Sequence, residues 1–344
     1  MMRGDPGLEV VEHVRAAFDP GPEWSAVSPR GFTWWPAAFS QRIESDVARR
    51  VDGVDQWRVQ AELELLQGVE GRGEHFARMA AWNALRPGLS SLRWNGDAHT
   101  VSLCATVYAR EGDHERPARD LATAALLQLA DATRDGAALA QDLGGELALS
   151  APPSGEVREQ PDALTEGWRQ VAESGAKPSP FTTMRLQAAA AMKDAPWLRV
   201  NVDGGGLHAE VPCAAEGGPA PGSAPGAGVA LLHLLHTQPH PQLGAGLLAA
   251  LALPPDAEPV RERIVGTAAL LNEAEAREFT PMDGTGAWCF HPQAGLACVS
   301  FVPALLDEPS RIERLAYAMA ARARWTRTFL LRIARMRDGA PPRA

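Results

Sequence analysis

Three histidines in the second half of the chain have a spacing that could bind a metal ion. His233, His236 and His240 form an H-x-x-H-x-x-x-H pattern, and on a helix these positions would bring three imidazoles near one face, as zinc sites require. Residues 229–238, however, are apolar and favour a strand. On a strand, His233 and His236 point to opposite faces and cannot share an ion. We therefore expect no metal ion here, and a metal-dependent protein is the alternative function.

Two cysteines could form a second reactive pair. Cys289 and Cys298 lie symmetrically about a predicted turn at 292–295, so we expect them to face each other across a hairpin at a distance that a disulfide could span. Four cysteines without a C-x-x-C motif in 344 residues are not a disulfide framework. In a cytoplasmic protein these side chains are reduced, partly buried thiols.

No other motif predicts catalysis. Glu62 and Glu64 share one face of a predicted strand, as paired acid/base carboxylates could, but a half-exposed strand has a solvated polar face of this kind. The glycines at 203–206 predict a hairpin turn, because no Gly-Lys-Ser/Thr follows them as in a phosphate-binding loop. Asp283-Gly-Thr-Gly lacks the flanking residues of known motifs and predicts a loop. We therefore expect neither enzymatic activity nor a cofactor.

Arginines make the last predicted helix strongly basic, although the net charge of the chain is −9. Some of them complement the negative end of the helix dipole. The others could contact an acidic partner or a phosphate backbone, while an exposed charged face is the simplest interpretation. These arginines are Arg311, Arg314, Arg322, Arg324, Arg327, Arg332, Arg335 and Arg337.

Tryptophans gather on predicted strands and helix ends, where core packing is their usual role. A surplus of tryptophan could also line a groove. The residues concerned are Trp34, Trp35, Trp57, Trp82, Trp94 and Trp288. From these aromatic, polar and basic positions we select six candidates for contact with a partner: Trp34, Trp35, Arg58, Glu62, Arg324 and Arg327.

The elements that position these residues follow a repeated order. Residues 80–132 and 270–336 each predict the end of a helix, a hairpin and a long amphipathic helix. The clearest strand is 56–65, in which apolar and polar residues alternate, so one face is core and the other is wet. The first half predicts the order αβββαββα, and the second half predicts αββββαββα, with an opening helix at 161–192 and one extra strand.

The length fits two domains. We expect a first domain at 1–146, a turn-rich linker at 147–157, a second domain at 158–337 and a tail at 338–344. The N-terminus lacks the apolar region of a secretory signal, and no apolar run approaches the roughly 20 residues of a membrane helix. We expect a cytoplasmic protein without membrane contact, whose acidic charge disfavours nucleic acid.

The repeated order, with Trp82-Asn83 and Leu271-Asn272 ending the helices, resembles the class I type III secretion chaperone fold and the related YbjN-like bacterial proteins. The resemblance covers both halves, and segment 238–254 is similar to part of uncharacterised actinobacterial proteins of this group. In these chaperones two copies pair as a homodimer, and client segments wrap around the outside. The resemblance implies an α+β fold of two tandem chaperone-like domains that form a monomeric pseudo-dimer.

The expected function follows from this resemblance and from the lack of a catalytic motif. We expect a non-enzymatic, chaperone-like module that binds another protein or an extended peptide. The alternative is a metal-dependent enzyme or metal-binding protein that uses the region of His233, His236 and His240. A third hypothesis is nucleic-acid binding by the arginine-rich helix.

Overall fold

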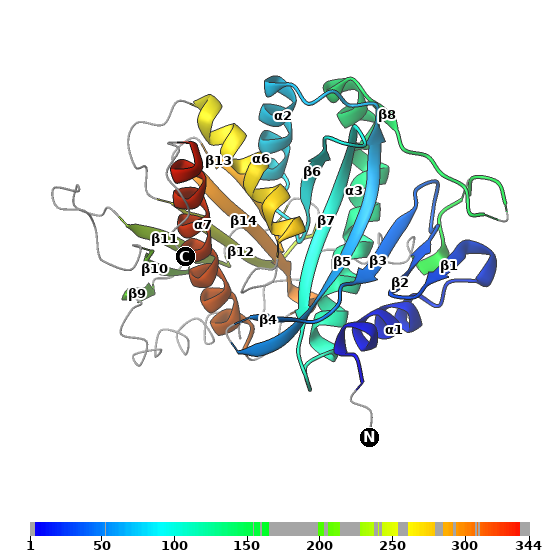
Figure 1. Ribbon diagram of the computed structural model, residues 1–344, viewed down its shortest axis with the longest axis horizontal. Helices are drawn as coiled ribbons and strands as arrows, with labels where there is room; N and C mark the ends of the chain where they lie inside the picture. The colour runs from blue at the N-terminus through cyan, green and yellow to red at the C-terminus, as the bar shows by residue number, and fades with distance from the viewer. Residues whose placement is uncertain are drawn as a thin grey trace.

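The computed structural model shows an α+β protein with two antiparallel sheets (Figure 1). It describes residues 4–51, 53–153, 155–158, 160–164, 199–202, 206–213, 228–236, 240, 243–253, 261–278, 285–291, 294–306, 308 and 310–337. Within these residues, no helix is both long enough and apolar enough to cross a membrane.

The first sheet is built around β5, a strand of 14 residues. Its alternation is confirmed from Val59 to Leu65, because Val59, Ala61, Leu63 and Leu65 are completely buried on one face, whereas Gln56, expected on the wet face, is buried. The strand order is β1-β2-β3-β5-β7-β6, and two short strands, β4 and β8, also pair with β5. The strands are β1 (Ser25–Ser28), β2 (Gly31–Trp34), β3 (Gln41–Ser45), β4 (Arg49–Val51), β5 (Val54–Gln67), β6 (Ser91–Asn95), β7 (Thr100–Ala109) and β8 (Glu146–Leu147).

Helices α1 (Pro6–Phe18) and α3 (Glu115–Leu143) cover the apolar face of this sheet. Asp5 caps α1, since its side chain accepts a hydrogen bond from the Leu8 amide at 3.1 Å. Helix α3 ends at Gly144, whose φ of 68° is the left-handed conformation that glycine adopts without strain. A short 3₁₀ helix, η1 (Pro22–Trp24), leads into β1.

The second sheet has the strand order β13-β14-β12-β11-β10-β9. This order matches β6-β7-β5-β3-β2-β1 of the first sheet, so the extra strand predicted in the second half has a counterpart in β1. Helix α7 (Arg311–Arg337) packs on β10, β11 and β12. The other elements are β9 (Arg199–Val202), β10 (Gly206–Pro212), β11 (Val229–Leu235), β12 (Gly246–Ala252), α6 (Arg261–Arg277), β13 (Ala287–His291), β14 (Gly295–Pro303) and η2 (Ala304–Leu306).

The two halves meet through α2 (Gly73–Leu85) and α6, which lie side by side between the sheets (Figure 1). Helix α2 contacts β13 of the second sheet, and α6 contacts β6 and β7 of the first. Helix α6 lies on the face of the first sheet opposite to α3, where its last turn meets the side chains of β5. Each half therefore completes the packing of the other.

The hydrophobic-Asn pair expected to end each helix lies before its end, since α2 continues to Leu85 and α6 to Arg277, but it has a structural role. The Asn83 carboxamide oxygen accepts the amide of Leu92 on β6 at 3.1 Å. In the second half, the Asn272 oxygen accepts the amide of Trp288 on β13 at 2.8 Å, and its nitrogen donates to the Trp288 carbonyl at 3.0 Å. Both asparagines are buried. The same side chain therefore ties a helix to the hairpin that follows it in both halves.

Two sequence-based expectations are wrong. Cys289 and Cys298 do not face each other, because Cys289 pairs with Ala297 while Cys298 pairs with Trp288. A register difference of one residue places the two thiols on opposite faces of the sheet, and both are free and buried. The polar face of β5 is not wet throughout either, since α6 covers part of it.

The chain stays on the first sheet beyond the predicted boundary at 146. Strand β8 pairs with β5, the Ser150 amide donates to the Ala38 carbonyl at 3.0 Å, and the Asp162 amide donates to the Pro36 carbonyl at 2.7 Å. Most of the helix predicted at 161–192 lies outside the described residues. So do the turn residues 203–205, nearly all of the Gly/Pro-rich segment 214–228, residues 283–284 of the Asp-Gly-Thr-Gly motif and the tail at 338–344.

Candidate functional site

A cleft of about 390 Å³ opens where the end of β7 and the starts of α3 and α7 meet. Both tyrosines of the chain, Tyr108 and Tyr317, line it. Five arginines line it as well, from both halves of the chain: Arg110, Arg116, Arg311, Arg314 and Arg324. Asp120 is the only carboxylate among the lining residues. The described part of the chain thus concentrates cationic and aromatic side chains here, in a protein whose net charge is −9. We call this the arginine cleft.

Helix α7 supplies one wall of the arginine cleft. Arg311, Arg314, Tyr317 and Arg324 lie along one side of this helix, since their spacing keeps them within about half of its circumference. Tyr317 and Arg324 are exposed. The opposite wall comes from the first half, where the buried Tyr108 is the next-to-last residue of β7. The cleft therefore exists only when both halves are in place.

A buried ion pair fixes the floor of the cleft. Both terminal nitrogens of Arg311 donate to the two carboxylate oxygens of Asp120 at 2.7 Å, so the contact is bidentate. The side chains of Arg311 and Asp120 are only 11% and 6% exposed. Nearby, Arg119 on α3 donates to Glu308 at 2.6 Å. These contacts lock the start of α3 to the start of α7 and hold the cationic walls at a fixed separation.

The arginine cleft suits an anionic ligand. Asp120 neutralises Arg311, Glu308 contacts Arg311 and Arg314, and Asp113 pairs with Arg116, so the ion pairs of the described residues set three carboxylates against five guanidinium groups. A guanidinium group can bind a carboxylate or a phosphate through two parallel hydrogen bonds. A concave surface with one sign of charge also concentrates oppositely charged ligands. The arrangement therefore favours binding of carboxylates or phosphates.

The two tryptophans selected from the sequence lie in the interior. The side-chain nitrogen of Trp34 donates to the Gln41 carboxamide oxygen at 2.9 Å, and that of Trp35 donates to the Ser150 hydroxyl at 3.1 Å. Trp34 is 1% exposed and Trp35 is 7% exposed. Because both indoles are covered by the first half itself, they offer little surface to a partner in this conformation.

Arg58 and Glu62, also selected from the sequence, lie on the covered polar face of β5. The Arg58 guanidinium donates to the Ala276 carbonyl at 2.9 Å, and Gln60 donates to the same oxygen at 2.6 Å. This carbonyl is at the C-terminal end of α6, where a cation also complements the helix dipole. Arg58 therefore holds the two halves together.

Glu62 lies between two arginines. Burial alone would raise the pKa of Glu62, but the charges of Arg93 and Arg42 outweigh it and lower this pKa below its ordinary value. Arg93 also approaches Glu273 on α6 at 3.7 Å. An ionised Glu62 in this setting stabilises the contact between the halves and is poorly suited to accept a proton in catalysis.

Of the two basic residues selected on α7, Arg324 lines the arginine cleft and Arg327 lies one turn further on, half-buried. The sequence indicated a basic helix. Which arginines would meet Tyr108 and Asp120 was not predictable, because these residues come from the other half of the chain. The spacing of residues in the sequence could show only which arginines share one side of α7.

The three histidines of the predicted motif do not form a metal-ligand cluster. His233 lies on β11, His236 follows that strand, and the His240 ring accepts a hydrogen bond from the Leu243 amide at 3.1 Å. In the described segments, no group of three or more metal-binding side chains of the His, Cys, Asp and Glu types occurs. His233 instead faces His208 on β10, a residue that the sequence analysis missed because the pairing depends on strand register.

We expect His240 to make the protein less stable below pH 6.5. Burial, together with the charges of Arg134 and Arg86, lowers the pKa of His240 from 6.5 to about 4. As pH falls below 6.5, the unfolded chain takes up a proton that the folded chain refuses, so stability is lost progressively between pH 6.5 and 4. At pH 5 the loss should be about 2 kcal/mol, measurable as the change in free energy of unfolding in urea between pH 7.5 and pH 5.

The variant His240→Asn serves as the control for this prediction. Asparagine keeps a hydrogen-bond acceptor for the Leu243 amide but does not titrate in this range. The difference in stability between pH 7.5 and pH 5 should therefore be smaller in the variant than in the wild-type protein. An equal pH dependence in both proteins would contradict the role of His240.

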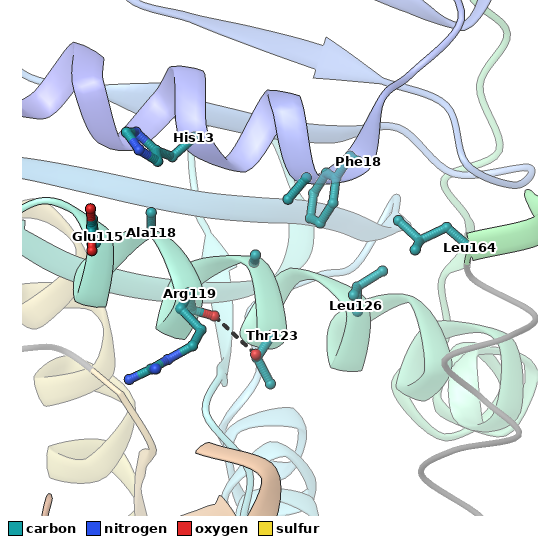
Figure 2. Close-up of a pocket in the computed structure, with 10 residues that line it drawn as sticks. His13, Phe18, Glu115, Ala118, Arg119, Thr123, Leu126 and Leu164 are labelled. Atoms are coloured by element: carbon teal, nitrogen blue, oxygen red, sulfur yellow. Dashed lines mark hydrogen bonds between the residues drawn. The ribbon is translucent and has the colours of Figure 1, made fainter. Parts of the chain in front are cut away.

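A second hollow, of about 310 Å³, lies between α1 and α3 (Figure 2). Phe18, Ala118, Leu126 and Leu164 make its walls largely apolar. Figure 2 also shows the Thr123 hydroxyl donating to the Arg119 carbonyl, at 2.9 Å, within α3 itself. This groove lacks the concentration of charge that distinguishes the arginine cleft, so the cleft is the better candidate for a functional site.

Comparisons with protein-family models, with curated proteins and with solved structures give no match to this chain.

Proposed function

We propose that this protein is a non-enzymatic, chaperone-like binding module that captures an acidic, extended segment of another protein in the arginine cleft. The observation that supports this most strongly is the lining of the cleft, in which five arginines and both tyrosines of the chain converge from two halves. Arginine and tyrosine are the residue types that protein interfaces favour. Asp120 pairs with Arg311 and so offsets the charge of one of these five arginines.

An extended peptide fits this site better than a compact small molecule. The cleft is open to solvent along α7, where Tyr317 is 47% exposed and Arg324 is also exposed. Acidic side chains of a peptide would meet the guanidinium groups, while its apolar side chains would pack on the exposed ring of Tyr317. Binding would be sensitive to salt, since exposed charges on both partners contribute.

The architecture supports a tandem, pseudo-dimeric arrangement of the type III secretion chaperone kind. The two sheets share one strand order, and α2 and α6 make reciprocal contacts with the opposite half. On this proposal a single chain supplies both copies, and the arginine cleft lies where the copies meet. The protein would act in the cytoplasm, where its four free cysteines remain reduced.

The proposal is tested by fluorescence anisotropy with a labelled peptide of alternating aspartate and phenylalanine. In the double variant Arg110→Glu/Arg324→Glu, a negative charge replaces a positive one at two positions of the cleft. This variant should bind the peptide at least tenfold more weakly, a change of about 1.4 kcal/mol in binding free energy. Binding to the wild-type protein should also weaken as the salt concentration rises. Replacement of Arg78, an exposed arginine on α2, with glutamate is the matched control and should leave the affinity nearly unchanged.

Two results would overturn the proposal. One is equal peptide affinity in the wild-type protein and in the Arg110→Glu/Arg324→Glu variant. The other is tighter binding of a single-stranded oligonucleotide with the same charge as the peptide, which would make nucleic acid the partner of the arginine cleft. A basic peptide of the same length should not bind.

A further inference from the structure

Two histidines face each other across neighbouring strands of the second sheet. His208 on β10 is the direct register partner of His233 on β11. Their Nδ1 atoms are 2.7 Å apart, and their ring planes are inclined at 69°. Seven consecutive residue pairs, from Gly206 with Leu235 to Pro212 with Val229, fix the two strands relative to each other. The two imidazoles are therefore held together by rigid backbone.

The pair lies on the face of the second sheet opposite to α7. Its strand neighbours Leu207, Leu232 and Leu234 point the other way and are completely buried beneath that helix. The arginine cleft is lined by α7 itself. The histidine pair is therefore a separate site, and it does not depend on the proposed binding of a peptide.

The short distance between the two nitrogens constrains their protonation. A separation of 2.7 Å fits one proton between the two Nδ1 atoms, so one ring donates and the other accepts through its lone pair. Burial and the neighbouring His208 ring lower the pKa of His233, which favours the neutral ring near neutral pH. A neutral imidazole is the form that binds metal ions.

We propose that His208 and His233 form a two-imidazole site for a divalent transition-metal ion that takes its ligands at right angles, such as Ni²⁺ or Cu²⁺. The ion would displace the shared proton and lie to one side of the line between the two Nδ1 atoms, and the proton moves to the Nε2 atom of the same ring as the tautomer changes. Rotation of both rings would turn the two Nδ1 lone pairs toward the ion. Water would fill the remaining coordination positions.

The geometry favours right-angled over tetrahedral coordination. With metal–nitrogen bonds of about 2.1 Å, two ligands at a right angle lie about 3.0 Å apart, and two ligands at the tetrahedral angle lie about 3.4 Å apart. The observed separation of 2.7 Å is closer to the first value. Small rotations of the rings would suffice for Ni²⁺ or Cu²⁺, while the tetrahedral geometry that Zn²⁺ prefers requires a larger opening.

The test is calorimetric titration of the full-length protein, free of any affinity tag, with Ni²⁺ at pH 7.5. Ni²⁺ is chosen as the probe because, unlike Cu²⁺, it does not oxidise thiols. The wild-type protein should bind one equivalent of Ni²⁺. The His208→Gln variant and the His233→Gln variant should each bind this Ni²⁺ at least tenfold more weakly. Zn²⁺ should bind this site more weakly than Ni²⁺. His291→Gln removes an exposed histidine from β13 of the same sheet, and this variant should still bind one equivalent of Ni²⁺ with the wild-type affinity.

A second measurement separates loss of the site from loss of the fold. Saturating Ni²⁺ should raise the melting temperature of the wild-type protein and of His291→Gln, because a ligand that binds only the folded state stabilises it. It should not raise that of His208→Gln or His233→Gln. If either of these two variants folds and retains the wild-type affinity for Ni²⁺, the inference is wrong. Preference for Zn²⁺ over Ni²⁺ at this site would also contradict it.

Discussion

Replacing Glu275 with alanine should lower the free energy of unfolding by about 3–5 kcal/mol, because the change leaves a buried guanidinium without its carboxylate. Glu275 on α6 accepts two hydrogen bonds from Arg322 on α7, at 2.8 and 2.7 Å. It also accepts the indole N–H of Trp288 at 2.8 Å. The side chain of Arg322 is only 2% exposed, so water cannot replace the lost partner. Urea denaturation followed by tryptophan fluorescence would measure the loss.

Two further variants identify the cause. Exchanging both residues for apolar side chains, Glu275→Leu with Arg322→Met, removes the uncompensated charge and should recover much of the loss. Removal of an exposed carboxylate, Glu12→Ala next to Arg15, should cost less than about 1 kcal/mol. If Glu275→Ala costs no more than Glu12→Ala, the buried ion pair does not stabilise the second half.

Replacing Asp120 with alanine should cost about 3 kcal/mol or more, and the effect should reach both halves. Asp120 on α3 belongs to the first half, while its bidentate partner Arg311 begins α7 in the second. Without the carboxylate, the buried Arg311 remains close to Arg116 with less compensating charge. Besides a lower stability in urea, we expect faster amide hydrogen exchange in the first turns of both α3 and α7.

A double-mutant cycle tests whether the contact itself is responsible. Asp120→Ala and Arg311→Ala remove the same interaction, so the double variant should lose clearly less stability than the sum of the two single losses. Additive losses would show that the two residues act independently. Faster exchange confined to α3 would show that the ion pair does not connect the halves.

The sequence predicted the local elements better than their contacts. The alternation in β5 and the asparagines in the last turns of α2 and α6 are local signals, and the structure confirms the strand and the helices, although α6 runs five residues beyond Asn272. The short strands β1 and β4 were missed, since strands of three or four residues hold few alternating positions. The predicted pairing of Cys289 with Cys298 failed by one residue, because the register of a hairpin depends on its loop.

The candidate sites depend on tertiary contacts that no local pattern encodes. The basic character of α7 was visible, but its Arg311 meets Asp120 across 191 residues of sequence. His233 was noticed for its spacing to His236 and His240, whereas its actual neighbour is His208 on the next strand. A sequence shows which side chains share a face of one element. Which elements then face each other is decided by the packing of whole sheets and helices.

The position of α6 between the sheets has a consequence for synthesis on the ribosome. The polar face of β5 is complete only when Arg58 and Gln60 reach the carbonyl of Ala276, more than 200 residues later in the chain. At typical rates of translation, the first half waits on the order of ten seconds or more before its covering helix has been made. During that interval a nascent chain exposes the surface that α6 later occupies.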